Sequence, residues 1–259
     1  MHLDTWNPTQ YEKFRGEREQ PFFDLLALIR PALDMRVVDL GCGTGKLTGL
    51  LHTTLNARDT LGIDRSARML EEARSGPLPK GLRFDVTSIE GFDASGEYDV
   101  VASNAALHWV DDHAALIPRL ARALRPSGQL AFQVPAMHDS ISHTIADDLA
   151  ATEFREDFKG WRRPQPVLTP DAYSRLLYRA GFVEQRVQLA VYPHVLPSRE
   201  DVVEWMKGTL LTEYDRHLPP ERFPAFLEAY RTRLLAALDD QRPFFFPFKR
   251  ILCWGQRAV

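Results

Sequence analysis

Three glycines spaced two residues apart give the clearest sign of chemistry in this chain. They stand in VVDLGCGTG at residues 37–45, directly after an apolar run that predicts a buried strand. Glycines let the backbone turn at positive φ and approach a ligand closely. In open α/β sheets such a strand-to-helix turn is the default ligand site, although a tight turn without a ligand is the alternative.

Asp39, at the end of that strand, narrows the choice of ligand. A carboxylate beside the glycine turn would repel a pyrophosphate group. The spacing also departs from the dinucleotide motif G-x-G-x-x-G, because Lys46 stands at the third glycine position, and from the Walker A motif, because Leu47 follows that lysine. The loop therefore suits a ligand that carries ammonium groups and no phosphate.

Asp64 is a second carboxylate, 25 residues after Asp39 and at the end of the next predicted strand. An acid at this place can accept hydrogen bonds from both hydroxyls of a ribose. The alternative is an acid that only stabilises the start of the next helix, for which Ser66 is the predicted N-cap.

Further polar residues follow the later predicted strands. Asn104, His108 and Trp109 come at and after the end of the strand over 97–105. Tyr192 and His194 stand two apart in the strand over 184–196 and therefore share one face, either in a pocket or as two exposed rings.

Cations are the other candidates for binding an acceptor. Lys249 and Arg250 are adjacent in the last predicted strand, so they must face opposite sides, and an arginine can bind a carboxylate bidentately. Arg162 and Arg163 lie in a Pro-rich loop and are expected as surface charges. Three consecutive phenylalanines at 244–246 are expected to be buried on both faces of a strand.

The elements that must position these residues alternate along the first part of the chain. Strands of three to nine residues alternate with helical periods, which predicts an α/β fold with a parallel sheet and helices on both faces. The predicted strands are 36–40, 59–64, 82–84, 97–105 and 128–135, and the predicted helices are 21–29, 46–55, 66–74 and 113–124.

The rhythm changes near Ala136, so two regions are predicted. Residues 1–135 form the ligand-binding core with an N-terminal cover. Residues 136–259 form a cap and substrate region, with a helical insertion at 198–240 between the final sheet strands.

Composition excludes several classes of protein. The net charge of −3 over 259 residues gives no basic excess for nucleic acid. Two cysteines cannot form a disulfide framework or a structural zinc site, and no metal is expected. The N-terminal residues lack a signal sequence, and no apolar run is long enough for a membrane span. These features predict a cytoplasmic protein without a membrane partner; the oligomeric state is open, with a monomer favoured.

The motif D-x-G-x-G-x-G together with Asp64 resembles class I S-adenosylmethionine-dependent methyltransferases over residues 36–135. The resemblance implies a doubly wound, mostly parallel, Rossmann-like sheet of about seven strands with a helical cap. It also implies that the loop holds the methionine half of S-adenosylmethionine and that Arg65 lies beside the adenine. Ser88 and Ile89 take the place of the usual adenine-binding acid, because Asp85 lies too early, inside a strand.

A narrower resemblance covers nearly the whole chain. WNPTQYEKFRGER (6–18), ASNAALHWVDDH (102–113) and VVEWMKGTLL (202–211) are similar to the trans-aconitate 2-methyltransferase family. It implies that Tyr11 and Arg18 lie near the methionine carboxylate. One departure is that no arginine follows Thr209-Leu210-Leu211, where this family carries one, which favours a larger or more apolar acceptor.

Together these arguments assign two sets of residues. The cofactor-binding set is Tyr11, Arg18, Asp39, Gly41, Cys42, Gly43, Asp64, Arg65, Ser88, Ile89 and Asn104. The substrate-binding set is His108, Trp109, Tyr192, His194, Trp205 and Arg250.

The favoured reaction is O-methylation of a small-molecule carboxylate, which is already a nucleophile at pH 7 and needs no general base. The first alternative is methylation of a hydroxyl, nitrogen or carbon on a more hydrophobic metabolite, with His108 or His194 as the base. The second is a cofactor-binding sensor or accessory protein without turnover.

Overall fold

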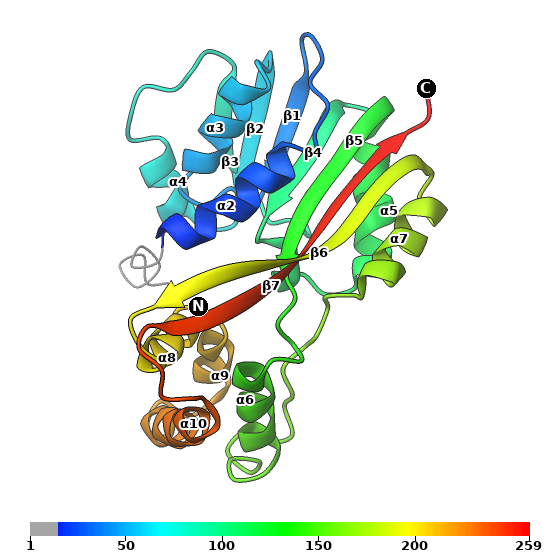
Figure 1. Ribbon diagram of the computed structural model, residues 1–259. Coiled ribbons are helices and arrows are strands. Elements are labelled where there is room, and N and C mark those ends of the chain that lie inside the picture. Colours follow the sequence, from blue (N-terminus) through cyan, green and yellow to red (C-terminus); the bar gives the residue numbers. More distant parts are fainter. Residues whose placement is uncertain (1–14) are drawn as a thin grey trace. The chain divides into compact units, whose positions relative to one another are not determined.

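The computed structural model describes residues 15–259, and their side chains from residue 19 on. This part of the chain forms two compact units, whose elements are labelled in Figure 1. The sheet unit consists of Glu19–Pro135, Pro166–Ala190 and Arg250–Val259. The helical unit contains Ala136–Gln165 and Val191–Lys249.

The strands form one seven-stranded sheet in the order β3-β2-β1-β4-β5-β7-β6. Strands β1 to β5 are parallel, and β7 runs antiparallel to β5. This mostly parallel α/β sheet confirms the predicted fold class. The strands are β1 Arg36–Leu40, β2 Asp59–Asp64, β3 Leu82–Val86, β4 Tyr98–Asn104, β5 Leu124–Pro135, β6 Phe182–Leu196 and β7 Phe244–Arg257.

The strand order reverses between β1 and β4, which are neighbours in the sheet. Ligands of open α/β sheets bind at such a switch point, outside the carboxyl ends of the strands. Asp39 pairs with Gly62 of β2 on one side and with Ala102 of β4 on the other. The glycine loop that follows β1 therefore lies at the switch point.

Two helices flanking the sheet begin at the side-chain caps that the sequence predicts. Ser66 accepts a hydrogen bond from Met69 N, and Thr169 accepts one from Ala172 N, with Pro170 in the first helical position. The helices that flank the sheet are α2 Arg15–Leu26, α3 Lys46–Thr54, α4 Ala67–Ala73, the 3-10 turn η1 Leu107–Trp109, α5 His113–Ala123 and α7 Pro170–Arg179.

The helical unit packs around aromatic rings. Phe226 stacks on Tyr214 with ring centroids 5.2 Å apart, and Phe154 meets the same Phe226 edge-on. Residues of β7 join this core in alternation: Phe244 and Phe246 are buried, whereas Phe245 is 53% exposed. The expectation that all three phenylalanines are buried was therefore wrong, because only one face of β7 is covered at residues 244–248. The helices are α6 Ile141–Ala151, α8 Glu200–Lys207, α9 Leu211–His217 and α10 Phe223–Ala237.

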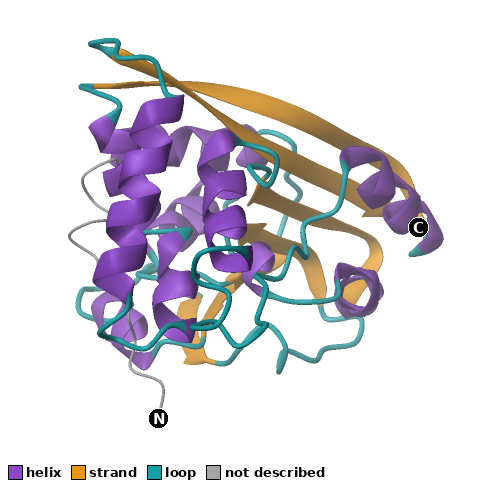
Figure 2. Cartoon of the chain, turned by 90° about the horizontal axis from the view of Figure 1, so that it is seen from below, coloured by secondary structure: helices purple, strands orange, loops and turns teal. Residues whose placement is uncertain are grey.

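The units cut across the two predicted regions. Pro166–Ala190 and Arg250–Val259, assigned above to the second region, belong to the sheet unit. The reason is that α7 contacts α5 and that the end of β7 pairs with β5. Strands β6 and β7 are the longest of the sheet and are labelled in Figure 1. Figure 2 shows the strands in orange and the helices in purple.

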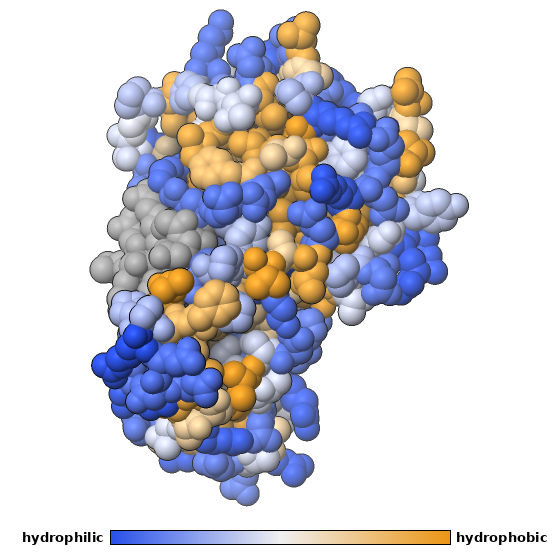
Figure 3. Space-filling view, in the orientation of Figure 1, coloured by the Kyte–Doolittle hydropathy of each residue, from blue (hydrophilic) through white to orange (hydrophobic). Residues whose placement is uncertain are grey.

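Exposed apolar side chains follow the edge strand β6, where Val183, Leu189, Val191 and Val195 are each more than half exposed. On the face seen in Figure 3, apolar residues are interspersed with hydrophilic ones. Among residues 15–259, the helices are all too short or too polar to cross a membrane.

Candidate active site

The three glycines after β1 adopt positive φ, and two of them are required by packing. A Cβ atom at Gly41 would lie 2.2 Å from the Cβ atom of Ala106, and one at Gly45 would lie 2.5 Å from the ring of Phe84. At Gly43, where φ is 56°, a Cβ atom would meet no atom within 4 Å. Gly43 is therefore the open point of the loop, where a ligand can approach the backbone.

Asp39 is buried beneath this loop. Its carboxylate accepts a hydrogen bond of 2.6 Å from the Thr48 hydroxyl of α3. Burial raises the pKa of Asp39 to about 6, while the Thr48 bond lowers it and the charge of Asp64 raises it further. An ammonium group bound nearby would favour the ionised form, so the buried acid fits a cationic ligand.

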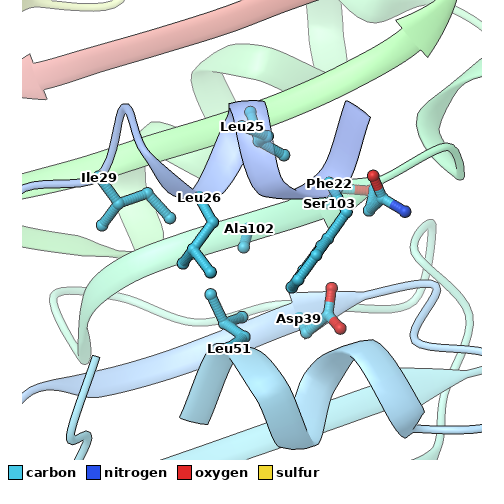
Figure 4. Close-up of a pocket in the computed structure, with 9 residues that line it drawn as sticks. Phe22, Leu25, Leu26, Ile29, Asp39, Leu51, Ala102 and Ser103 are labelled. Atoms are coloured by element: carbon cyan, nitrogen blue, oxygen red, sulfur yellow. The ribbon is translucent and has the colours of Figure 1, made fainter. Parts of the chain in front are cut away.

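A small pocket lies beside Asp39, and the Phe22 ring of α2 points toward that carboxylate in Figure 4. The pocket is lined by Phe22, Leu25, Leu26, Ile29, Asp39, Leu51, Ala102, Ser103 and Asn104.

Asp64 connects the glycine loop to the start of α4. One carboxylate oxygen accepts from Gly43 N and the other from Ser66 N, both at 2.9 Å. Each oxygen keeps a second lone pair, so two ribose hydroxyls remain possible donors. Asp64 thus contacts the N-cap residue of α4 and the glycine loop, and its ribose role stays a prediction. Arg65, beside it, is exposed.

The turn after β3 contains the predicted adenine residues. The Ser88 hydroxyl accepts from Gly91 N at 3.0 Å, and Ile89 is buried. Asp85 lies inside β3 opposite Ile63 and is exposed. Arg119 of α5, which sequence reasoning missed, donates to the carbonyl of Ile89 at 2.9 Å and thereby holds this turn.

The side chain of Cys42 is partly buried. It packs against the cluster of α4 and β3 that contains Leu70 and Phe84. Burial, followed by the charges of Asp39 and Asp64, raises the pKa of the thiol well above its ordinary value. The contact of Cys42 with the cofactor stays a prediction.

Three side chains form a polar chain across the carboxyl ends of β4 and β5. Arg250 donates to the Gln133 side-chain oxygen at 3.0 Å, and the Gln133 nitrogen donates to the Asn104 side-chain oxygen at 2.7 Å. Gln133 and Arg250 are both buried. Sequence reasoning missed Gln133; the available signal was a polar residue inside the apolar strand GQLAFQVP.

His108 lies near these three polar side chains, and its imidazole ring is neutral at pH 7. Burial, and next the charge of Arg250, lower the pKa of the ring to about 3. The Nδ1 atom of His108 is buried and has no hydrogen-bond partner among the side chains of residues 19–259 or the backbone of residues 15–259. The ring of Trp109, which is 36% exposed, packs against the His108 ring at an interplanar angle of 42°, with ring centroids 4.7 Å apart.

The remaining predicted substrate residues belong to the helical unit. Tyr192 and His194 are buried on the same face of β6, which excludes the alternative of two exposed rings. The His194 ring stacks on Trp205 at 27°, with centroids 5.0 Å apart. Their contact with a substrate stays a prediction.

Two expectations about cations have different outcomes. Arg162 is exposed, but Arg163 is mostly buried and donates to both oxygens of Asp147, at 3.2 and 2.9 Å. The surface assignment was wrong for Arg163, because Asp147 comes from α6 and had no sequence signal. Lys249 forms an ion pair with Asp139, and its neighbour Arg250 is buried, as their opposite faces predict.

Residue Tyr11 and the side chain of Arg18 lie outside the described residues. Their predicted contacts with the methionine carboxylate therefore stay predictions.

Known proteins that are similar to this chain are methyltransferases, in agreement with the ligand loop at the switch point of the sheet. A family model described as a methyltransferase domain matches residues 12–185. A trans-aconitate 2-methyltransferase of Deinococcus radiodurans is 42% identical over 254 residues, covering 96% of each chain. One from Streptomyces coelicolor is 39% identical and covers 98% of this chain and 87% of its own.

Solved structures share the fold at low identity. The YcgJ protein of Bacillus subtilis superposes with a TM-score of 0.62 at 16% identity, covering 92% of this chain and 98% of its own. A putative S-adenosylmethionine-dependent methyltransferase of Listeria monocytogenes gives 0.53 at 18% identity, covering 94% and 100%. This chain belongs to the trans-aconitate 2-methyltransferase family of S-adenosylmethionine-dependent methyltransferases.

Proposed function

We propose that the enzyme methylates a carboxylate oxygen of trans-aconitate or of a closely similar tricarboxylate. The observation that carries this proposal is Arg250, a buried cation at the carboxyl ends of β4 and β5, beside a neutral His108. A guanidinium can bind a carboxylate through two parallel hydrogen bonds. The similar enzymes from Deinococcus radiodurans and Streptomyces coelicolor are named for this substrate. This similarity over nearly the whole chain favours a tricarboxylate over the larger or more apolar acceptor that the missing arginine after Leu211 suggested.

S-adenosylmethionine fits the sheet unit in three places. The open side of Gly43 admits a ligand to the loop, Asp64 keeps lone pairs for ribose hydroxyls, and Asp39 favours a cationic group. When bound, the cofactor supplies a methyl group on a sulfonium centre, which a carboxylate oxygen can take without giving up a proton. The residues of this chain then have to bind and orient the two molecules.

The titration of His108 supports a carboxylate acceptor. A ring with a pKa of about 3 is a poor proton acceptor at pH 7, because efficient general bases have a pKa near the working pH. Its neutral ring can still bind an acceptor through its nitrogen atoms. A hydroxyl, amine or carbon acceptor would need a stronger base.

The experiment is methyl transfer from labelled S-adenosylmethionine to separate pools of carboxylic acids, phenols and amines. Label in trans-aconitate as a base-labile ester is the expected result. Label only in a base-stable product would mean a hydroxyl, nitrogen or carbon acceptor. Absence of label from every pool, with the cofactor bound, would mean a sensor or accessory protein.

A free tricarboxylate as the acceptor requires neither nucleic acid nor a membrane as partner. The net charge of −3 is in keeping with this. We further propose that the enzyme is a cytoplasmic monomer, which sedimentation at several protein concentrations would test for the oligomeric state.

A further inference from the structure

Gln133 lies between Asn104, which is predicted to bind the cofactor, and Arg250, which is proposed to bind the acceptor. It stands opposite Asn104 of β4 in the sheet register, and opposite Leu252 of β7 on its other side. Arg250 lies two residues from Leu252, so its side chain is on the same face of β7 and meets Gln133 diagonally. Gln133 has an exposed fraction of 0%.

The chemistry of its neighbours fixes which way the Gln133 amide points. A guanidinium can only donate, so the Gln133 oxygen must face Arg250. The amide nitrogen then faces Asn104, whose side-chain oxygen accepts at 2.7 Å. Reversing the amide would place two donors together at Arg250 and two acceptors together at Asn104.

The bond to Arg250 is made by an oxygen without formal charge. It can therefore orient the guanidinium without cancelling its positive charge, which is felt at His108 as a lowered pKa of that ring. A carboxylate at position 133 would orient Arg250 equally well but would compete with an anionic acceptor for it.

We infer that Gln133 is a positioning residue, which holds Arg250 in the orientation that receives the acceptor's carboxylate and uses Asn104 as its anchor. This inference rests on the proposed function. It assigns to a buried amide, distant in sequence from Arg250, part of the selectivity for an anionic acceptor.

The test compares Gln133→Glu and Gln133→Met with the full-length enzyme, using trans-aconitate as the acceptor. In Gln133→Glu the new carboxylate pairs with Arg250, and Asn104 can restore its bond by turning its amide. We expect the acceptor KM to rise roughly 10- to 100-fold, because an interaction of a charged group is lost. The affinity for S-adenosylhomocysteine, measured by calorimetry, should change by a smaller factor than the acceptor KM, because only the turned amide of Asn104 reaches the cofactor-binding set.

Gln129→Glu is the matched control, since Gln129 is a second buried glutamine of the same strand. Its oxygen accepts from Arg30 N and Trp254 Nε1, and its nitrogen donates to the Arg30 carbonyl, at 2.8 to 2.9 Å. This variant should lower the melting temperature and leave the acceptor KM unchanged.

Three outcomes would overturn the inference. An unchanged acceptor KM in both Gln133 variants would show that Arg250 needs no such support. If melting temperature, cofactor affinity and kcat all fell together in the Gln133 variants and in Gln129→Glu, the role of Gln133 would be structural only. If Gln133→Glu does not fold, Gln133→Met decides by the same criteria. A wild-type enzyme that methylates no carboxylate would instead overturn the proposed function, and this inference with it.

Discussion

At the scale of single residues, the two carboxylates next to the glycine loop, Asp39 and Asp64, have different environments. Asp39 is buried with a raised pKa, whereas Asp64 is partly exposed and holds two backbone amides. Their identity and spacing could be read from the sequence, because each stands at the end of a predicted strand. Their different environments could not, since these depend on Thr48 and on the covering elements.

Replacement of Asp64 tests the ribose assignment. We expect Asp64→Ala to weaken S-adenosylmethionine by roughly 2–3 kcal/mol, because charge-assisted hydrogen bonds to the ribose are lost. Asp85→Ala is the control, since this exposed acid inside β3 should leave the affinity unchanged. Equal calorimetric affinities of wild type and Asp64→Ala would contradict the assignment.

Asp39 gives a prediction about stability and pH. Its pKa is raised from the ordinary value of 3.8 to about 6, so between these values the folded protein holds a proton that the unfolded chain has lost. The contribution of Asp39 to the free energy of unfolding is therefore largest at and below about pH 4. It decreases as the pH rises to about 6 and does not change further above that pH. The loss is on the order of 2–3 kcal/mol.

Asp39→Asn isolates this contribution, because its amide oxygen can still accept from Thr48. The unfolding free energy of wild type minus that of the variant, measured by urea denaturation without cofactor, should fall between pH 4 and pH 6. Parallel curves for the two proteins over that range would contradict the raised pKa.

At the scale of elements, short-range sequence signals predicted the loop and the helix caps correctly. Contacts between residues distant in sequence could not be predicted. The glycine loop and the caps at Ser66 and Thr169 each depend on a few neighbouring residues. The bond between Gln133 and Arg250 joins residues 117 apart, and no local pattern indicates it. Arg163 was misassigned for the same reason.

The loop itself can be tested by two matched substitutions. Gly41→Ala places a Cβ atom 2.2 Å from Ala106 and should destabilise the fold by more than the positive φ costs alone, which is about 1 kcal/mol. In Gly43→Ala the new Cβ atom meets no protein atom within 4 Å, so the fold should lose only the free energy that the positive φ costs. The same Cβ atom should abolish cofactor binding, because it occupies the open side of the loop.

Thermal unfolding and calorimetry distinguish the two variants. Retained cofactor affinity in a folded Gly43→Ala protein would show that the open side of Gly43 is not part of the binding site. Equal stability of the two variants would contradict the packing at Gly41.

At the scale of the whole molecule, the cofactor assignments that fall on described side chains all lie in the sheet unit. We therefore expect S-adenosylhomocysteine to slow backbone hydrogen exchange at residues 40–46, 64–66 and 86–91. Helix α10 of the helical unit serves as the internal control. Protection of α10 without protection of the glycine loop would contradict the location of the site.

The most direct test of the central claim, methylation of a carboxylate without a general base, is the dependence of kcat on pH. A carboxylate acceptor has a pKa near 4, and the ring of His108 titrates at about 3, so kcat should be flat between about pH 6 and 8. An acid limb with an apparent pKa of roughly 6–7, together with a loss of 10²-fold or more in His108→Ala or His194→Ala, would contradict the claim and indicate a base-dependent acceptor.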